Sequence, residues 1–163
     1  MQELTSPLNA AFWLHIGLTM LCGGIIGLER QLRGKPAGIR TSILICLGTQ
    51  TFVSLSVALN VGNAAYDPSR VLGQVVTGIG FIGAGVIMGK EGAVKGVTSA
   101  AIIWMLAAIG SAIGLGYLAM AATLTLMTVG VLIGVELLEA SFRKLRQGVH
   151  ARYGKEEPDP DED

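Results

Sequence analysis

The chain has 163 residues, 51% of them hydrophobic and 15% charged, with 23 glycines and a formal net charge of zero. A soluble domain has about 25% charged residues, so this chain has too few ions to cover a surface in contact with water. The composition therefore predicts one compact integral membrane domain. It excludes a disordered chain, a disulfide-stapled secreted domain and a nucleic-acid-binding protein.

Charge-free runs show where the chain can cross a membrane. Four runs contain no Asp, Glu, Lys or Arg: 4–28, 41–66, 71–89 and 96–135. A charge at the bilayer centre costs about 2.5–3.5 kcal/mol and a helical crossing needs about 20 residues, so the first three runs supply one helix each. The fourth run has the length of two crossings, and the glycines before Tyr117 mark a turn that divides it into two helices.

The predicted fold is therefore an all-α bundle of five transmembrane helices, within a domain over 1–140. The approximate bounds of these helices are 10–28, 41–59, 71–88, 98–113 and 117–138. The first helix is not read as a signal peptide, because Glu29-Arg30 follows it where small cleavage residues are needed. Residues 141–163 form a tail that is first basic and then acidic, and we expect it to be disordered.

Lys and Arg residues fall on one side of the predicted bundle. Eleven of the twelve lie in the first loop, the third loop and the tail, whereas Arg70 lies on the opposite side. Cytoplasmic loops carry the excess of Lys and Arg, so the N-terminus is predicted outside and the C-terminus in the cytoplasm. Trp13, Tyr66 and Tyr117 then lie at the outer interface, where aromatic residues are enriched. Trp104 does not fit this belt, and we expect it to pack inside the bundle.

Glycines four residues apart recur in the predicted helices. The pairs are Gly23/Gly27, Gly85/Gly89, Gly110/Gly114 and Gly130/Gly134. Small residues allow helices to approach closely in a bilayer, so the first interpretation is packing within one subunit. Because five short helices enclose little interior, self-association is the alternative, and we expect a homo-oligomer, with a dimer favoured.

The third predicted helix contains four closely spaced glycines: Gly78, Gly80, Gly83 and Gly85. They match the dinucleotide pattern G-x-G-x-x-G, but Asp67-Pro68-Ser69-Arg70 precedes them instead of a strand, so this interpretation is rejected. Asp67 is instead expected to be the N-cap of a helix and Pro68 its first residue. The glycines either pack tightly or break the helix beside a polar cavity, as in transporters. Under both interpretations we expect Gly80→Leu to disrupt assembly.

Five ionic residues are expected at the edges of the helices: Glu29, Arg30 and Arg40 on the cytoplasmic side, and Asp67 and Arg70 on the outer side. Ordinary interfacial solvation is the plain interpretation. The alternative is that opposite charges pair at one membrane depth and fix the helix register. Asp67 is also a candidate oxygen ligand for a cation, although one carboxylate does not make a metal site.

Other polar residues lie within the predicted helices. We expect His15, Thr49, Gln50, Thr51 and Gln74 to hydrogen-bond to backbone or neighbouring helices rather than to line a pore. Cys22 and Cys46 are expected to act as small apolar side chains. The sequence has no H-E-x-x-H, G-x-S-x-G or Walker A motif, so we expect neither an enzyme nor a cofactor.

A series of short segments carries a family resemblance. In order they are Gly24-Ile25-Ile26-Gly27-Leu28-Glu29-Arg30, Pro36-Ala37-Gly38-Ile39-Arg40-Thr41, Asp67-Pro68-Ser69-Arg70, Gly78-Ile79-Gly80-Phe81-Ile82-Gly83-Ala84-Gly85 and Gly96-Val97-Thr98-Ser99-Ala100-Ala101, followed by Trp104. Together they resemble the MgtC/SapB family. Thr41, Thr98, Ser99 and Trp104 are thereby marked as motif residues, with Ser99 in place of the family's usual second Thr. Longer members also carry a cytoplasmic domain similar to ACT modules, where this chain has only its tail.

The resemblance implies a multi-pass protein of the bacterial inner membrane, linked to growth in low magnesium, acid stress and survival of pathogens in macrophages. It implies a regulator that acts on membrane partners such as the F-type ATP synthase. The alternative is a transporter or channel for magnesium, protons or another cation that uses the third helix and Asp67.

Overall fold

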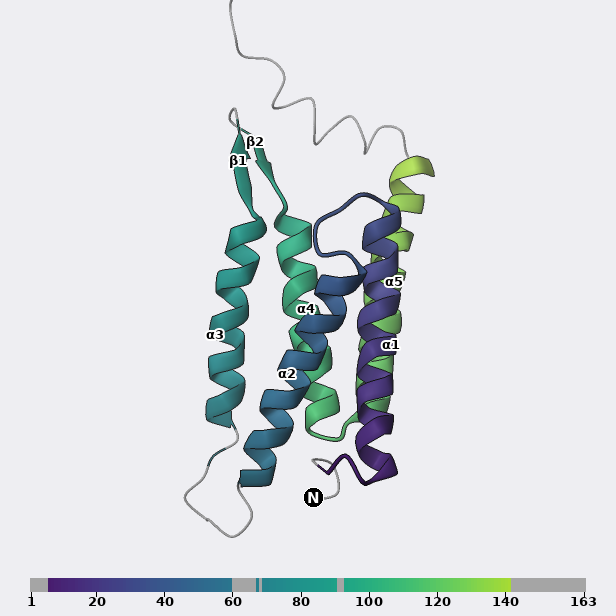
Figure 1. Ribbon diagram of the computed structural model, residues 1–163. Coiled ribbons are helices and arrows are strands. Elements are labelled where there is room, and N and C mark those ends of the chain that lie inside the picture. Colours follow the sequence, from purple (N-terminus) through teal and green to yellow (C-terminus); the bar gives the residue numbers. More distant parts are fainter. Residues whose placement is uncertain (1–5, 60–66, 68, 91–92, 142–163) are drawn as a thin grey trace, which may run out of the picture.

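A computed structural model describes residues 6–59, 67, 69–90 and 93–141. Its helices are α1 (Ala10–Leu32), α2 (Ile39–Leu59), α3 (Ser69–Val86), α4 (Val97–Gly114) and α5 (Leu118–Ser141) (Figure 1). An antiparallel hairpin of β1 (Met88–Lys90) and β2 (Ala93–Lys95) joins α3 to α4. All five helices are long and apolar enough to cross a membrane, which confirms the predicted number of spans.

The hairpin marks one end of the bundle (Figure 1). That end, called the hairpin end below, also carries the loop between α1 and α2. The turn between α4 and α5 lies at the opposite end, called the turn end. This turn follows Gly114, as predicted from the glycines before Tyr117.

Helix α1 is longer than expected because its charged residues continue the helix instead of ending it. It begins after Asn9, whose side chain accepts a hydrogen bond from the Ala11 N–H at 2.9 Å. At the other end it runs through Glu29 and Arg30 to Leu32. A basic residue in the last turn is favourable because it lies near the negative end of the helix dipole.

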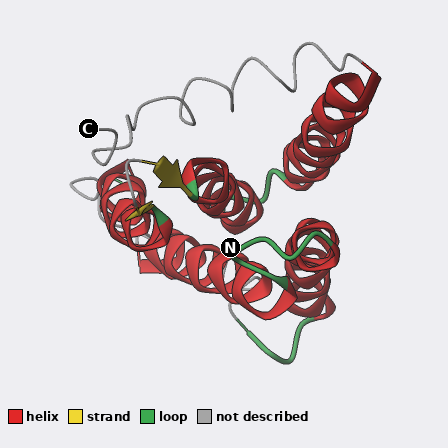
Figure 2. Ribbon diagram, turned by 90° about the horizontal axis from the view of Figure 1, so that it is seen from above, coloured by secondary structure: helices red, strands yellow, loops and turns green. Residues whose placement is uncertain are grey.

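The core is built mainly by α1, α2 and α4. Seen from above, α3 and α5 lie on either side of α4, and α2 crosses beside it (Figure 2). The largest group of buried apolar side chains joins α1, α2, α4 and α5: Cys22, Ile26, Cys46, Ile102, Leu106, Ile109, Ala112, Ile113 and Ala121. A smaller group joins α3 to α4 through Ile79, Ile103 and Ala107.

Two of the predicted glycine pairs bring helix backbones together. A Cβ atom on Gly27 would lie 2.6 Å from the Cα of Ile39, and one on Gly23 would lie 2.9 Å from the Cα of Ile43. The pair Gly110/Gly114 of α4 approaches α2 in the same way, at 2.6 Å and 2.8 Å from backbone oxygens. Packing within the subunit is therefore confirmed for these two pairs.

Other glycines do not pack as expected. Helix α3 is continuous, and a Cβ atom on Gly78, Gly80 or Gly85 would meet no atom of the described residues within 4 Å. By contrast, a Cβ atom on Gly83 would lie 3.6 Å from the Cβ of Ala100. The physical reason is that α3 packs on α4 through one face, and the other three glycines lie off that face. The prediction that these three glycines pack within the subunit is therefore wrong. Packing within the subunit gives no reason to expect that Gly80→Leu disrupts assembly.

The two remaining glycine pairs, Gly85/Gly89 and Gly130/Gly134, do not pack against a neighbouring helix as predicted. Gly89 lies in β1 and not in a helix, so Gly85/Gly89 is no helical pair. On α5, a Cβ atom added to Gly130 or Gly134 would have no atom of the described residues within 4 Å. These two glycines leave an open face on that helix.

Trp104 is also placed differently from the expectation. Its side chain is 54% exposed on α4, although we expected it inside the bundle. Lipid is as apolar as a protein core, so an outward-facing aromatic side chain in a membrane helix carries no penalty of the kind that water imposes. Of the aromatic residues assigned to the interface, Trp13 and Tyr117 are each 60% exposed, and Tyr66 lies outside the described residues.

Gly96 fixes the junction between the hairpin and α4. It is the N-cap of α4 and has φ of 93°, a left-handed conformation that favours glycine. A Cβ atom there would also lie 2.2 Å from the carbonyl oxygen of Val86. Both constraints require glycine at this position.

Candidate functional site

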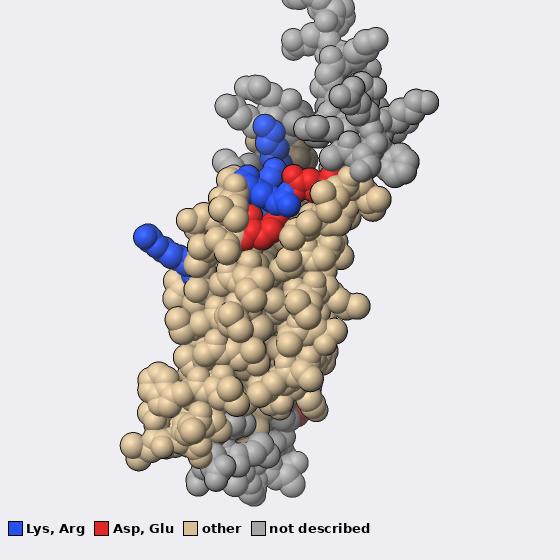
Figure 3. Space-filling view, turned by 90° about the vertical axis from the view of Figure 1, so that its right-hand side faces the viewer, with Lys and Arg blue, Asp and Glu red and all other residues tan. Residues whose placement is uncertain are grey.

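Charged side chains gather at the hairpin end, above a surface made of uncharged residues (Figure 3). A cavity of about 530 Å³ lies there between α1, α4 and α5. It is called the charged cavity, and its lining residues are Glu29, Arg30, Arg33, Lys35, Thr98, Val131, Leu132, Val135 and Glu136. Three sequence-predicted site residues, Glu29, Arg30 and Thr98, thus line one site together with residues of α5.

Arg33 links the two carboxylates of the charged cavity. Its Nε lies 2.5 Å from Oε1 of Glu29, one helical turn earlier, and its Nη1 forms an ion pair with Oε2 of Glu136 on α5. A Glu four residues before an Arg is the favourable order for such a pair on a helix. The sequence contains this spacing, although we singled out neither Arg33 nor Glu136. The contact with Glu136 depends on how α1 packs against α5, which no local pattern reveals.

Arg30 is the most deeply placed cation of the cavity. Its side chain is only 3% exposed, and Nη2 donates a hydrogen bond of 2.6 Å to the hydroxyl of Ser99 on α4. Its Nε has no hydrogen-bond partner among the described residues, nor has Oε2 of Glu29. Both atoms are themselves buried, and buried charged groups without full hydrogen bonding are unfavourable, so they mark an incompletely satisfied polar cluster beside the cavity.

Arg40 and the two ions of the turn end lie apart from this cavity. Arg40 is exposed on the first turn of α2, and within the described part of the chain it forms no ion pair with Glu29. Asp67 and Arg70 lie near the start of α3, also exposed. The structure therefore brings Glu29 and Arg30 into one site and leaves the other three ions on the surface.

Asp67 caps the start of α3. Its Oδ2 accepts a hydrogen bond from the Ser69 hydroxyl at 2.7 Å, and its Oδ1 accepts one from the Ser69 N–H at 2.9 Å. These two bonds, with a smaller contribution from the charge of Arg70, hold the pKa of Asp67 below its ordinary value. Among the residues that the structure describes, no three His, Cys, Asp or Glu side chains are grouped closely enough to hold a metal ion.

Polar side chains also lie buried deeper in the bundle. The Gln50 amide donates from Nε2 to the Ser54 hydroxyl at 3.1 Å, and that hydroxyl donates to the Gly114 carbonyl of α4 at 3.3 Å. Cys46 makes a similar link through Sγ to the carbonyl oxygen of Leu106, at 3.2 Å. His15 is 5% exposed, and its Nδ1 is without a hydrogen-bond partner among the described residues, as is Oε1 of Gln50.

The remaining polar residues named from the sequence are distributed over the bundle. Thr98 lines the charged cavity beside Ser99, and Thr49 is buried on α2. Thr41, Thr51 and Gln74 are exposed. Thr41 and Gln74 belong to the walls of a separate, apolar groove between α2 and α3.

Comparisons with known proteins cover most of the chain. Residues 16–141 match the model of the MgtC family. The chain is 40% identical over 148 residues to the protein named "Putative magnesium transporter YhiD" of Escherichia coli (strain K12), covering 88% of this chain and 68% of that protein. It is 40% identical over 130 residues to protein MgtC of Brucella abortus (strain 2308), covering 78% and 53%.

A third relative is protein SapB of Bacillus subtilis (strain 168), 38% identical over 143 residues, or 81% of this chain and 58% of SapB. The chain thus spans little more than half the length of MgtC and SapB. Among solved structures, none matches the chain significantly.

Proposed function

Because the chain belongs to the MgtC family, we propose that it is a regulatory protein of the bacterial inner membrane that acts on a membrane partner. The observation that carries this proposal is the charged cavity. Glu29 and Arg30 each have a buried polar atom without a partner in the described residues, and the cavity beside them is also lined by Lys35 and Glu136, whose exposed side chains a charged group of another protein can contact.

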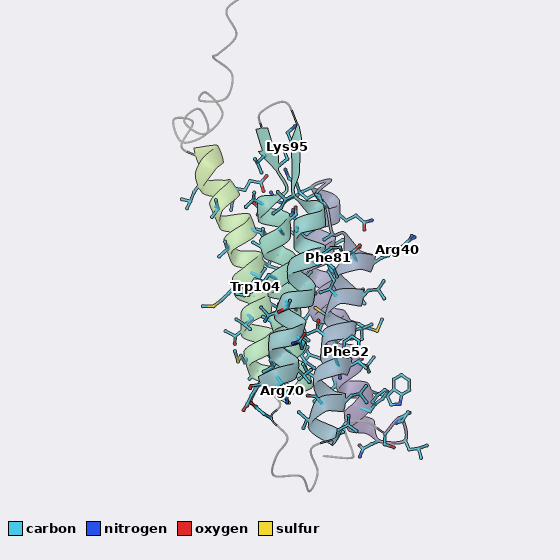
Figure 4. All side chains as sticks on the ribbon, turned by 90° about the vertical axis from the view of Figure 1, so that its left-hand side faces the viewer. Arg40, Phe52, Arg70, Phe81, Lys95 and Trp104 are labelled. Atoms are coloured by element: carbon cyan, nitrogen blue, oxygen red, sulfur yellow. The ribbon has the colours of Figure 1, made fainter. Side chains whose placement is uncertain are left out.

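The distribution of cations supports a cytoplasmic position for this cavity. Arg30, Arg33 and Lys35 lie at the hairpin end with Lys95, whereas Arg70 lies at the turn end (Figure 4). Under the positive-inside rule the hairpin end faces the cytoplasm. A partner with a cytoplasmic face, such as the F-type ATP synthase that the family resemblance implies, has access to the cavity in this orientation.

The test measures ATP-driven acidification of inverted membrane vesicles from cells with and without the protein. We expect the protein to reduce the acidification rate and Glu136→Gln to restore it, because Glu136 is a half-exposed charge that lines the cavity. Lys95→Gln is the matched control, since Lys95 is an exposed charge at the same end that does not line the cavity. Equal rates with and without the protein would rule out this partner.

A second candidate function is cation transport. It is favoured by the buried polar atoms of His15 and Gln50, which lack partners among the described residues, and by the name given to YhiD. Purified protein in liposomes separates the two functions. A regulator passes magnesium and protons no faster than protein-free liposomes, whereas flux that Gln50→Leu abolishes and Asp67→Asn leaves intact would establish transport through the bundle.

A further inference from the structure

The hairpin end of the bundle carries more positive than negative charge. Among the side chains that the structure describes there, the cations are those of Arg30, Arg33, Lys35, Arg40 and Lys95, and the carboxylates are those of Glu29 and Glu136. Three of these cations line the charged cavity. An anion is therefore attracted to this end of the bundle, and most closely to the cavity.

Lys35 is the cation of the cavity that is best placed to receive an anion. Arg33 already pairs with both carboxylates of the cavity, and the buried Arg30 donates to the neutral hydroxyl of Ser99. Lys35 is exposed and forms no ion pair within the described part of the chain. Its ammonium group has three N–H donors, so it can hold a carboxylate without breaking another contact of the cavity.

The sequence beyond α5 contains a block of negative charge. Its residues are Glu156-Glu157-Pro158-Asp159-Pro160-Asp161-Glu162-Asp163, which have six carboxylates and no cation. These residues are called the acidic segment. A block of five or six like charges repels itself and is typical of a segment that binds the opposite charge. The charged cavity and the acidic segment are therefore electrostatically complementary.

The acidic segment is attached close enough to reach the cavity. Helix α5 ends with Ser141 at the hairpin end, five residues after Glu136, which lines the cavity (Figure 1). Five helical residues rise about 7.5 Å. The connection over 142–155 can extend to at most about 50 Å, several times that distance. A connection of this length holds an attached segment at about millimolar effective concentration, so weak contacts are sufficient for docking.

We propose that the acidic segment docks at the charged cavity of its own chain, with carboxylates paired to Lys35 and Arg33. The contact is electrostatic and reversible, so it weakens as salt screens the charges. A docked segment covers the cavity and competes with a charged group of a membrane partner. This competition rests on the proposed regulatory function, whereas the docking itself does not.

The experiment treats the purified full-length protein with a carbodiimide, which converts a pair of lysine and carboxylate into an amide. Mass spectrometry then locates the amides. We expect the acidic segment to be joined to Lys35 about fivefold more often than to Lys95, the ratio that two exposed ion pairs provide. Lys95 is the matched control, because it is exposed at the same end and does not line the cavity. In high salt the two yields should become equal.

A second measurement follows access to the cavity. Val135→Cys places a thiol among the lining residues, and Val97→Cys places one at an exposed position of the same end that does not line the cavity. Replacing the six acidic residues by Gln and Asn should speed maleimide labelling of Val135→Cys about fivefold, because the same two ion pairs are lost. Labelling of Val97→Cys should not change.

Three results would overturn the proposal. The first is equal amide formation at Lys35 and Lys95 in low salt, together with an unchanged labelling rate of Val135→Cys. The second is amide formation at Lys144 and Lys155 alone, which would assign the acidic segment to the basic stretch before it. The third comes from an equal mixture of isotope-labelled and unlabelled protein, in which amides between the two kinds of chain would place the segment on a second copy.

Docking and regulation are tested separately. The carbodiimide and labelling experiments contain no partner protein, so their results do not depend on whether the vesicle test detects regulation. An amide at Lys35 without any effect of the protein on acidification would support the docking and reject the proposed partner.

Discussion

Arg30 on α1 and Ser99 on α4 form a buried hydrogen bond of 2.6 Å between residues 69 positions apart. Ser99 belongs to a motif of small and hydroxyl residues at the start of α4, and Arg30 ends a motif of α1. The contact explains why both segments carry polar residues where each helix meets the membrane edge. It joins the two helices at the charged cavity.

Removing the Ser99 hydroxyl should destabilise the bundle. In Ser99→Ala the buried guanidinium loses its hydrogen bond to α4, and bonds of this kind contribute about 1.5–3 kcal/mol. Ser99→Thr keeps the hydroxyl and serves as the control. The free energy of unfolding in mixed micelles, measured by denaturant titration, checks the difference. Equal stability of Ser99→Ala and the unchanged protein would contradict this role.

The ion pair between Arg33 and Glu136 should contribute little and depend on salt. Their side chains are 28% and 56% exposed, and ion pairs with such exposure contribute about 0.2–1 kcal/mol. A double-mutant cycle of Arg33→Gln and Glu136→Gln in low and high salt measures the coupling energy. We expect it to fall as salt screens the charges. A coupling that salt does not change would show that the pair is shielded from solvent.

Two glycine substitutions should have opposite outcomes. Gly27→Ala places a Cβ atom 2.6 Å from the Cα of Ile39, where only backbone movement can relieve the clash, so we expect a loss of about 1–3 kcal/mol. Gly80→Ala meets no described atom and should be tolerated. Unfolding in mixed micelles compares the two variants. If Gly80→Ala is the more harmful, an assembly contact on α3 must be present.

The cap at Asp67 should make the start of α3 sensitive to acid. The folded-state pKa lies below the unfolded value of about 3.9, so the carboxylate stabilises the cap fully above that value. This stability is lost as pH falls through the folded-state pKa. Hydrogen exchange gives the protection factors of the first amides of α3. These factors should fall between about pH 5 and about pH 2.5, a range that brackets the reference pKa. In Asp67→Asn, which caps without a charge, the protection factors of these amides should no longer change with pH over this range.

Cysteine labelling tests the proposed orientation. Lys95 and Arg70 lie at opposite ends of the bundle (Figure 4). With the hairpin end in the cytoplasm, a membrane-impermeant maleimide should label Arg70→Cys in intact spheroplasts and Lys95→Cys only after lysis. The native Cys22 and Cys46 are buried and provide the background. Labelling of Lys95→Cys in intact spheroplasts would invert the topology.

The sequence was sufficient to predict the number of helices but not which face of each helix packs against its neighbours. Charge-free runs determine the spans because charges in lipid are unfavourable, and this constraint acts along the chain. Which face of a helix packs is a tertiary property. The spacing of Gly23/Gly27 and of Gly78, Gly80 and Gly85 therefore predicted similar packing, although only the first pair meets a neighbouring helix in the described part of the chain.

The site shows the same limit. Glu29 and Arg30 were identifiable because they end a charge-free run, whereas Glu136 joins them only through the contact between α1 and α5. Trp104 was misplaced because reasoning from soluble proteins assigns a non-interfacial aromatic residue to the interior. The hairpin was missed because three-residue strands carry too short a pattern to distinguish from a loop.

The close backbone contacts of α1 and α4 with α2 have a mechanical consequence. At Gly27 and Gly110 the glycine backbone lies directly against α2, so these three helices cannot slide or rotate past one another without a backbone collision. They form a rigid frame. Helices α3 and α5 are the least buried of the five, so fewer buried contacts hold them against this frame. We therefore expect a movement that opens or closes the bundle to displace α3 or α5 rather than to occur within the three-helix frame.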